Sequence, residues 1–248
     1  MSKVMIVTGA SRGIGAAVAR MAGARGYAVC VNYASNRDAA DRVVADIERA
    51  GGKALAIGAD VSDSRQATEL FRQVDEKLGR VDVLVNNAGV IIRPCRVDEM
   101  EPALLERVFA VNTFSVYYCT REAVRRMSTR HGGAGGVIVQ MSSSAARHGG
   151  VPDETHYAGS KGAIDSMTIG LAKEIGREGI RVNGVRPGMI ETEIHDVHGG
   201  ASLIRQVAPT VPIGRSGTAD EVAETVMWLA SDAASYVHGA IIDVSGGR

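Results

Sequence analysis

Seven short apolar runs alternate along the chain with longer segments whose apolar residues recur at helical spacing. The apolar runs predict strands at residues 4–8, 28–33, 54–59, 81–86, 137–141, 180–185 and 240–244. The longer segments predict helices at residues 14–24, 37–50, 65–78, 101–130, 155–178 and 220–231. Each strand, helix and following strand implies a right-handed crossover between parallel neighbours. The alternation therefore predicts an α/β fold, a doubly wound seven-stranded parallel sheet with helices on both faces.

The length of the chain favours one large domain. Its 248 residues suffice for one well-covered α/β core but not comfortably for two. Aromatic residues make up only 4% of the chain and glycine occurs 30 times, so the interior must be built from small aliphatic side chains. We expect a single domain over residues 1–248, with the irregular residues 187–212 forming a mobile loop over a site at the strands' carboxyl ends.

The charge and cysteine content exclude several classes of protein. Lys plus Arg and Asp plus Glu both number 28, so no basic excess indicates a nucleic-acid partner. No segment resembles a membrane span. Cys30, Cys95 and Cys119 are widely spaced, without a disulfide framework or a zinc motif, and read as buried small hydrophobes. We expect a cytoplasmic protein that binds neither nucleic acid nor membrane.

A glycine-rich segment follows the first predicted strand and opens the first helix. In the run from Thr8, the glycines Gly9, Gly13 and Gly15 allow a tight turn and a close backbone approach to a pyrophosphate. The helix N-terminus behind them favours the negative charge of a phosphate. Because the triplet lies between a strand and a helix, it predicts a dinucleotide-binding site.

Tyr157 and Lys161 lie four residues apart, and Ser143 lies upstream at the end of a predicted strand. On a helix this spacing places the phenol and the ammonium on one face, where the cation favours the ionised phenol. Spacing alone is more typical of a surface helix with an extended lysine. A free phenol titrates near about 10, so reaching neutral pH needs roughly 4 kcal/mol. One solvated lysine does not supply that, and a second positive charge is expected nearby.

Further motifs occur in the order typical of one family. They are Asp60-Val61 after the third strand, Asn86-Asn87-Ala88-Gly89 after the fourth, Asn112, Pro187-Gly188, Thr192, and a final strand from Gly239 to Gly246-Gly247. With the glycine triplet and the Ser143, Tyr157 and Lys161 set, the chain resembles the short-chain dehydrogenase/reductase family over nearly its whole length. The resemblance implies a Rossmann fold and an NAD(P)-dependent oxidoreductase that interconverts an alcohol and a ketone or aldehyde.

The resemblance also implies a role for each catalytic residue. Tyr157 would exchange the proton of the substrate, and Lys161 would hold the nicotinamide ribose and lower the pKa of Tyr157. The oxidised nicotinamide would supply the second positive charge. Ser143 would bind the substrate oxygen, and Asn112 would hold a water that links Lys161 to solvent. Family spacing between serine and tyrosine selects Ser144, whereas alignment of the strand end selects Ser143, which we prefer.

The cofactor contacts implied by the resemblance come from seven segments. They are Gly9, Ser11, Arg12, Gly13, Ile14 and Gly15; Asn32, Tyr33, Ser35 and Asn36; Asp60 and Val61; Asn86, Asn87, Ala88 and Gly89; Tyr157 and Lys161; Pro187 and Gly188; and Ile190 and Thr192. Some of these residues have a plainer explanation, because Asp60 could cap a turn and Asn86-Asn87 could satisfy backbone groups.

The end of the second strand indicates which cofactor is used. Residues 31–37 contain no acidic side chain to accept the ribose 2′-hydroxyl of NAD. Arg12, Ser35, Asn36 and Arg37 could instead surround a 2′-phosphate, so NADP is the preferred cofactor and NAD stays possible. Both arginines could also be solvated surface residues.

The substrate is less well indicated. Residues 91–96, 145–156 and 190–211 should form its pocket and contribute Arg93, Arg147, His148, His195 and His198, which suits a small polar or polyol-like carbonyl or alcohol. His195 and His198 lack companion ligands, so no metal is predicted.

Three further readings follow from the resemblance. A 3-oxoacyl-acyl carrier reductase would need a basic surface, for which Arg125, Arg126 and Arg130 are available. A non-catalytic NADP-binding regulator would be expected to lack Tyr157, Lys161 or Ser143. Family analogy implies a homotetramer with contacts through helices 101–130 and 155–178, including Ala158, Gly162, Ala163 and Met167, and through the tail 235–248.

Overall fold

The sheet has the predicted seven strands, all parallel. The computed structural model describes residues 2–194 and 199–248. The strands are β1 (Val4–Val7), β2 (Ala28–Tyr33), β3 (Lys53–Gly58), β4 (Val81–Asn86), β5 (Gly136–Met141), β6 (Ile180–Pro187) and β7 (Ile241–Val244). Their order is β3-β2-β1-β4-β5-β6-β7, which confirms the doubly wound α/β fold in a single domain.

The strand order reverses between β1 and β4. The chain builds outward from β1 through β2 to β3, returns to the other side of β1, and continues through β4 to β7. In such sheets the connections leave the carboxyl ends of the two central strands in opposite directions and open a crevice there. The glycine loop follows β1 and residues 87–89 follow β4, so both motifs meet at this crevice.

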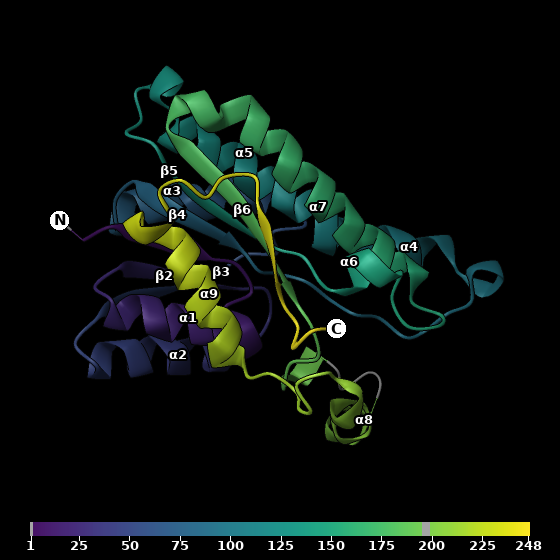
Figure 1. The fold of residues 1–248 in the computed structure, drawn as a ribbon. Coiled ribbons are helices and arrows are strands. Elements are labelled where there is room, and N and C mark those ends of the chain that lie inside the picture. Colours follow the sequence, from purple (N-terminus) through teal and green to yellow (C-terminus); the bar gives the residue numbers. More distant parts are fainter. Residues whose placement is uncertain (1, 195–198) are drawn as a thin grey trace.

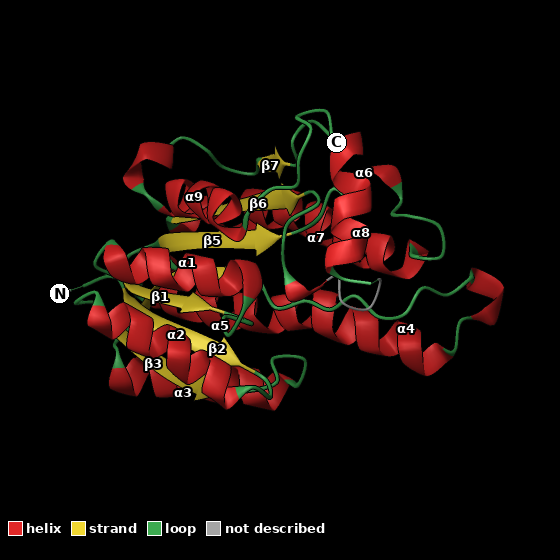
Figure 2. Cartoon of the chain, turned by 90° about the horizontal axis from the view of Figure 1, so that it is seen from below, coloured by secondary structure: helices red, strands yellow, loops and turns green. Residues whose placement is uncertain are grey.

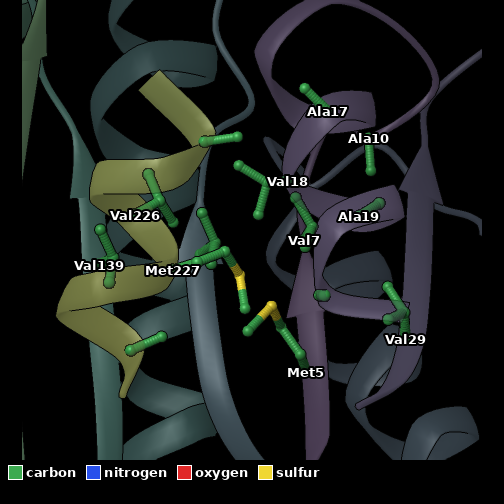
Figure 3. Close-up of a cluster of buried hydrophobic side chains, with 14 of the residues drawn as sticks. Met5, Val7, Ala10, Ala17, Val18, Ala19, Val29, Val139, Val226 and Met227 are labelled. Atoms are coloured by element: carbon green, nitrogen blue, oxygen red, sulfur yellow. The ribbon is translucent and has the colours of Figure 1, made fainter. Parts of the chain in front are cut away.

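Helices cover the two faces of the sheet in separate layers (Figures 1 and 2). One layer contains α1 (Gly13–Ala24), α2 (Arg37–Arg49) and α9 (Ala219–Ala230), and the other contains α3 (Ser64–Lys77), α5 (Ser115–Met127) and α7 (Thr155–Ile175). Figure 3 shows the first core, where Met5 of β1 and Val18 of α1 approach Met227 of α9. Small aliphatic side chains thus allow the close helix-to-sheet packing that the composition predicts.

The prediction of one continuous helix over residues 101–130 is wrong, because a π-helical segment interrupts it. The chain forms α4 (Pro102–Phe109), then a π-helical segment at Ala110–Phe114, and then α5. Ser115 Oγ donates to Val111 O at 2.6 Å, a side-chain bond to the wide turn. Such segments insert one residue into an α-helix and are common at functional sites. Asn112 lies in the middle of this one.

Two short helices lie where no helix was predicted. α6 (Ala145–His148) follows β5, and α8 (Ala201–Val207) lies within the irregular segment 187–212. Both are too short to display a helical period in the sequence. Within the described residues, no helix has the length and apolar character to cross a membrane.

Candidate active site

The glycine loop between β1 and α1 is pressed against the segment that follows β4. Gly9 has a φ of +61°, and a Cβ there would lie 2.9 Å from Ala88 Cα. A Cβ on Gly15 would lie 2.4 Å from Asn87 Nδ2 and 2.5 Å from Gly9 O. Real Cβ atoms do not approach other atoms this closely, so both positions require glycine.

Side-chain hydrogen bonds hold the two segments together. Asn87 Nδ2 donates to Thr8 O at 2.8 Å and to Gly9 O at 3.1 Å. Thr8 Oγ1 accepts from the backbone N of Asn87 and of Ala88, each at 3.0 Å. Asn32 is buried and accepts from Gly9 N at 3.3 Å, so its side chain supports the loop from below. These bonds fix the loop before any ligand arrives.

The N-terminus of α1 fits the phosphates of a dinucleotide. The cap residue Arg12 makes no side-chain hydrogen bond to the first turn, and that turn contains no acidic residue. The first amides of this 12-residue helix are therefore available to an anion. Ser11 and Gly13 lie beside them, and Gly13 approaches Thr192, whose Cγ2 would lie 3.4 Å from an added Cβ.

The residues predicted to contact the adenosine end of a dinucleotide follow β2 and β3. Tyr33 ends β2, and Ser35 is exposed after it, while Asn36 caps α2 by accepting from Ala39 N at 3.0 Å. Val61 packs in the core, which leaves only its backbone for a ligand.

Asp60 accepts hydrogen bonds within the turn that follows β3, as the alternative prediction of a turn cap expected. Burial disfavours its charge, but hydrogen bonds from the side chain and backbone of Ser62 and the charge of Arg107 outweigh burial and lower the pKa of Asp60. The carboxylate is therefore ionised and already engaged at the edge of the crevice.

Ser143, Tyr157 and Lys161 line one cleft, together with Gly89 and the turn that begins at Pro187. Ser143 follows β5, and Tyr157 and Lys161 lie one turn apart on α7. Ser143 makes a side-chain hydrogen bond with Tyr157 and accepts from Ala145 N at 3.2 Å.

The neighbouring serines have other contacts. Ser142 Oγ donates to Lys161 O at 3.2 Å, and Ser144 N donates to Pro187 O at 2.9 Å. Ser144 also lines the cleft. Of the three consecutive serines, the contact with the tyrosine is made by Ser143.

Burial dominates the protonation of this cluster. It raises the pKa of Tyr157 to about 12, against the lowering effect of the Ser143 hydrogen bond, and the charge of Glu154 raises it further. Burial also lowers the pKa of Lys161 to about 8, and the charge of Asp165 opposes this shift. The predicted lowering of the tyrosine pKa is therefore not a property of the protein alone, because desolvation of the phenol outweighs its hydrogen bond.

Asn112 connects the cluster to the residues after β4. Its Oδ1 accepts from Val90 N at 2.8 Å, and its Nδ2 donates to Val90 O at 3.0 Å and to Ser160 Oγ at 3.1 Å. Lys161 Nζ donates to Met141 O at 2.8 Å. A Cβ added to Gly89 would lie 3.4 Å from both Asn112 Oδ1 and Lys161 Nζ, so these three residues adjoin.

The walls of the cleft are mostly aliphatic. They include Ile91, Val151, Met189, Ile194, Leu203 and Val207. Most of these residues lie in the three predicted pocket segments, but Met189 and Arg248 were missed because they lie beyond those segments.

Two arginines expected in the pocket do not line it. Arg93 lies near Glu101, and Arg147 pairs with Asp243. Each arginine therefore has a carboxylate partner outside the cleft. His148 does line the cleft, whereas His195 and His198 lie outside the described residues.

The family model described as enoyl-(acyl carrier protein) reductase matches residues 9–248. The uncharacterized oxidoreductase YgfF of Escherichia coli is 44% identical over 245 residues, with 99% of each chain covered. Versicolorin reductase stcU of Emericella nidulans is 41% identical, and the L-rhamnose 1-dehydrogenase (NAD(P)(+)) of a Sphingomonas species is 38% identical; the matches cover 99% of this chain and 95% of each relative. The chain belongs to the short-chain dehydrogenase/reductase family.

A solved short-chain dehydrogenase/reductase has the same fold. A mutant form of the enzyme from Serratia marcescens superposes with a TM-score of 0.91 at 37% identity, covering 99% of this chain and 97% of that one. Membership of the family makes the protein an NAD(P)-dependent oxidoreductase that acts on CH–OH or carbonyl groups.

We expect Gly15→Ala to destabilise the protein by about 1–3 kcal/mol, because the new methyl group overlaps Gly9 O and Asn87. Gly170→Ala is the matched control, since that helical glycine has open space around it and alanine should stabilise the helix by up to about 1 kcal/mol. Urea denaturation measures both, and equal stability of Gly15→Ala and wild type would contradict the packing described.

Lys161 should make stability depend on pH in the alkaline range. Its pKa is lowered from 10.5 to about 8 in the folded protein, so the unfolded chain binds more protons between these pH values and stability rises with pH. Relative to Lys161→Met, wild type should gain about 3 kcal/mol between pH 8 and 10.5. Denaturation of both proteins across this range measures the difference, and a constant difference would show that Lys161 is not shifted.

Proposed function

We propose that the protein interconverts an alcohol and a ketone or aldehyde with NADP(H), and that Tyr157 is the acid and base. The observation that carries this proposal is the contact between Ser143 and Tyr157 in a cleft shared with the glycine-loop side of the crevice. The bound nicotinamide would supply the hydride acceptor or donor. Assays of wild type on a panel of ketones and aldehydes with NADPH, and on the corresponding alcohols with NADP, test the proposal. If wild type turns over none of these compounds, the result favours a non-catalytic regulator.

Ser143 and Tyr157 would act on the same substrate oxygen. Both side chains reach the cleft, so the serine hydroxyl can orient a carbonyl oxygen while the phenol donates its proton to it. In the reverse direction the phenolate would take the proton of the alcohol. Since the pKa of Tyr157 is about 12 in the protein alone, the positive charge of the oxidised cofactor and of Lys161 must favour the phenolate.

Lys161 and Asn112 would connect Tyr157 to solvent for proton transfer. The lysine is held by Met141 O, and its lowered pKa makes it able to release a proton near neutral pH. Asn112 fixes the adjoining segment at Val90 and Ser160, so it would define the space for a water between Lys161 and solvent. This arrangement supports a proton path to Tyr157.

Tyr157→Phe should lower kcat by roughly 10²–10⁴ while NADPH still binds, because only the transferable proton is removed. Ser143→Ala should lower kcat by at least about 10², whereas Ser144→Ala should stay within a few-fold of wild type. Steady-state kinetics measures the loss of kcat, and a fluorescence titration with NADPH shows whether cofactor binding is retained. A larger loss in Ser144→Ala than in Ser143→Ala would assign the catalytic role to Ser144.

NADP preference would depend on Arg12. Its guanidinium lies 3.2 Å from Glu193 Oε2, and both side chains are more than half exposed. Such pairs are worth only about 0–1 kcal/mol, so a 2′-phosphate could draw Arg12 away at little cost. Arg37 is paired with Asp41, and Ser35 is exposed where it could approach the same phosphate.

Arg12→Ala should lower kcat/KM for NADPH about tenfold and leave NADH nearly unchanged, because an ionic hydrogen bond to phosphate is lost. Glu193→Gln, which frees Arg12, should improve NADPH binding by up to about fivefold. Kinetics with both cofactors measures the change. A wild type that prefers NADH would overturn the NADP assignment.

The aliphatic walls of the cleft favour a substrate with an apolar body over the polyol that was first expected. The polyol expectation depended partly on Arg93 and Arg147, which pair with carboxylates outside the cleft. A sugar stays the second candidate, since one relative is named as an L-rhamnose 1-dehydrogenase. The acyl-carrier alternative is weaker, because Arg125 and Arg126 are paired with the buried Glu122, which leaves Arg130 as the exposed arginine of the three that does not pair with it.

A cytoplasmic homotetramer is the proposed assembly. Of the four residues expected at the contact face, Ala158 and Met167 are buried within the chain, whereas Gly162 and Ala163 are partly exposed. Phe114 and Tyr117 at α5 and Ile169 on α7 are exposed apolar side chains on the same two helices, which supports a contact there.

A further inference from the structure

One charged side chain in the cleft has no role in the proposed reaction. Arg248 lines the same cleft as Ser143 and Tyr157, although it lies in the turn after β7. Figures 1 and 2 both draw this end of the chain on the side of the molecule where α6 and α8 lie. Arg248 therefore belongs to the substrate side of the cleft rather than to the glycine loop.

The turn that carries Arg248 is fixed by packing. Gly246 and Gly247 have φ values of +64° and +94°, and an added Cβ would lie 2.8 Å from Val211 and 3.1 Å from Pro212 respectively. Ile213 N donates to Gly246 O at 3.1 Å, and Ser245 Oγ donates to Arg248 O at 2.8 Å. The backbone thus presents Arg248 at a defined place.

The guanidinium of Arg248 differs from those of three other arginines around the cleft. Those have carboxylate partners: Arg147 with Asp243, Arg186 with Asp165 and Asp243, and Arg215 with Glu221. Across residues 2–194 and 199–248, no ion pair or side-chain hydrogen bond engages the Arg248 guanidinium.

The other charges of the cleft lie near the tyrosine. Lys161 is bound to Met141 O, and Glu154 is buried just before α7, where its charge acts on Tyr157. The walls of the cleft also include aliphatic residues such as Leu203 and Val207. Arg248 is exposed, so its guanidinium is accessible to an anion that binds in the cleft.

We propose that Arg248 binds a carboxylate on the substrate, so that the enzyme prefers carbonyl compounds with an apolar body and an acidic group remote from the carbonyl. The planar guanidinium matches a carboxylate through two parallel hydrogen bonds. This inference rests on the proposed function, because it concerns the substrate of that same site.

The test compares para-formylbenzoate with its neutral methyl ester as substrates. In Arg248→Gln the acid-to-ester ratio of kcat/KM should fall about five- to tenfold through a higher KM for the acid, and Arg248→Lys should recover part of it. Arg205→Gln on α8 is the matched control, since Arg205 is an exposed arginine close in the fold that does not line the cleft. An unchanged ratio in Arg248→Gln overturns the proposal.

A binding measurement separates this inference from the reaction. NMR titration of wild type and Arg248→Gln with benzoate and with benzamide should show weaker benzoate binding in the variant only, by about five- to tenfold. If wild type reduces neither aldehyde but Arg248→Gln binds benzoate more weakly than wild type, the result counts against the proposed activity and supports the anion site. Equal benzoate affinity in both proteins would remove the anion site whatever the activity.

Discussion

The contact between the glycine loop and the segment after β4 determines the rest of the site. Gly9 and Gly15 have no room for a side chain because Ala88 and Asn87 occupy that space, and Asn87 bonds the carbonyls of Thr8 and Gly9. The ends of β1 and β4 are therefore locked at the point where the strand order reverses. With that junction rigid, the free amides of α1 and the tyrosine of α7 face one crevice, and a nucleotide needs no rearrangement of the sheet to bind.

Burial is the main influence on the pKa values of the candidate catalytic cluster of Ser143, Tyr157 and Lys161. Burial raises the pKa of Tyr157 to about 12 and lowers that of Lys161 to about 8, so both shifts disfavour the charged form of the group. A low-dielectric site also strengthens the effect of any new charge that enters it. The positively charged nicotinamide ring of a bound oxidised cofactor would therefore shift the proton affinity of Tyr157 strongly, which would couple the reactivity of this cluster to occupancy of the site.

Local patterns predicted the sheet well and the cleft walls less well. Buried strands such as β4 are continuous apolar runs, and motifs such as Asn87-Ala88-Gly89 lie directly after them, so strand ends and candidate site residues could be predicted together. The π-helical segment around Asn112 was missed because apolar spacing continues through it. The direction of Arg147 depends on Asp243, nearly a hundred residues away, and the place of Arg248 depends on packing against Pro212. Such contacts leave no periodic signal in the chain.

The π-helical segment also sets the relative phase of two helices. One inserted residue rotates everything after it by about 100° around the helix axis. Without it, Cys119, Ala123 and Met127 of α5, which now pack on the sheet, would turn away from it if α4 kept its place. A single-residue deletion within Ala110–Phe114 would therefore force a choice between a misplaced α4 and an exposed core, so this stretch should tolerate changes of residue type far better than changes of length.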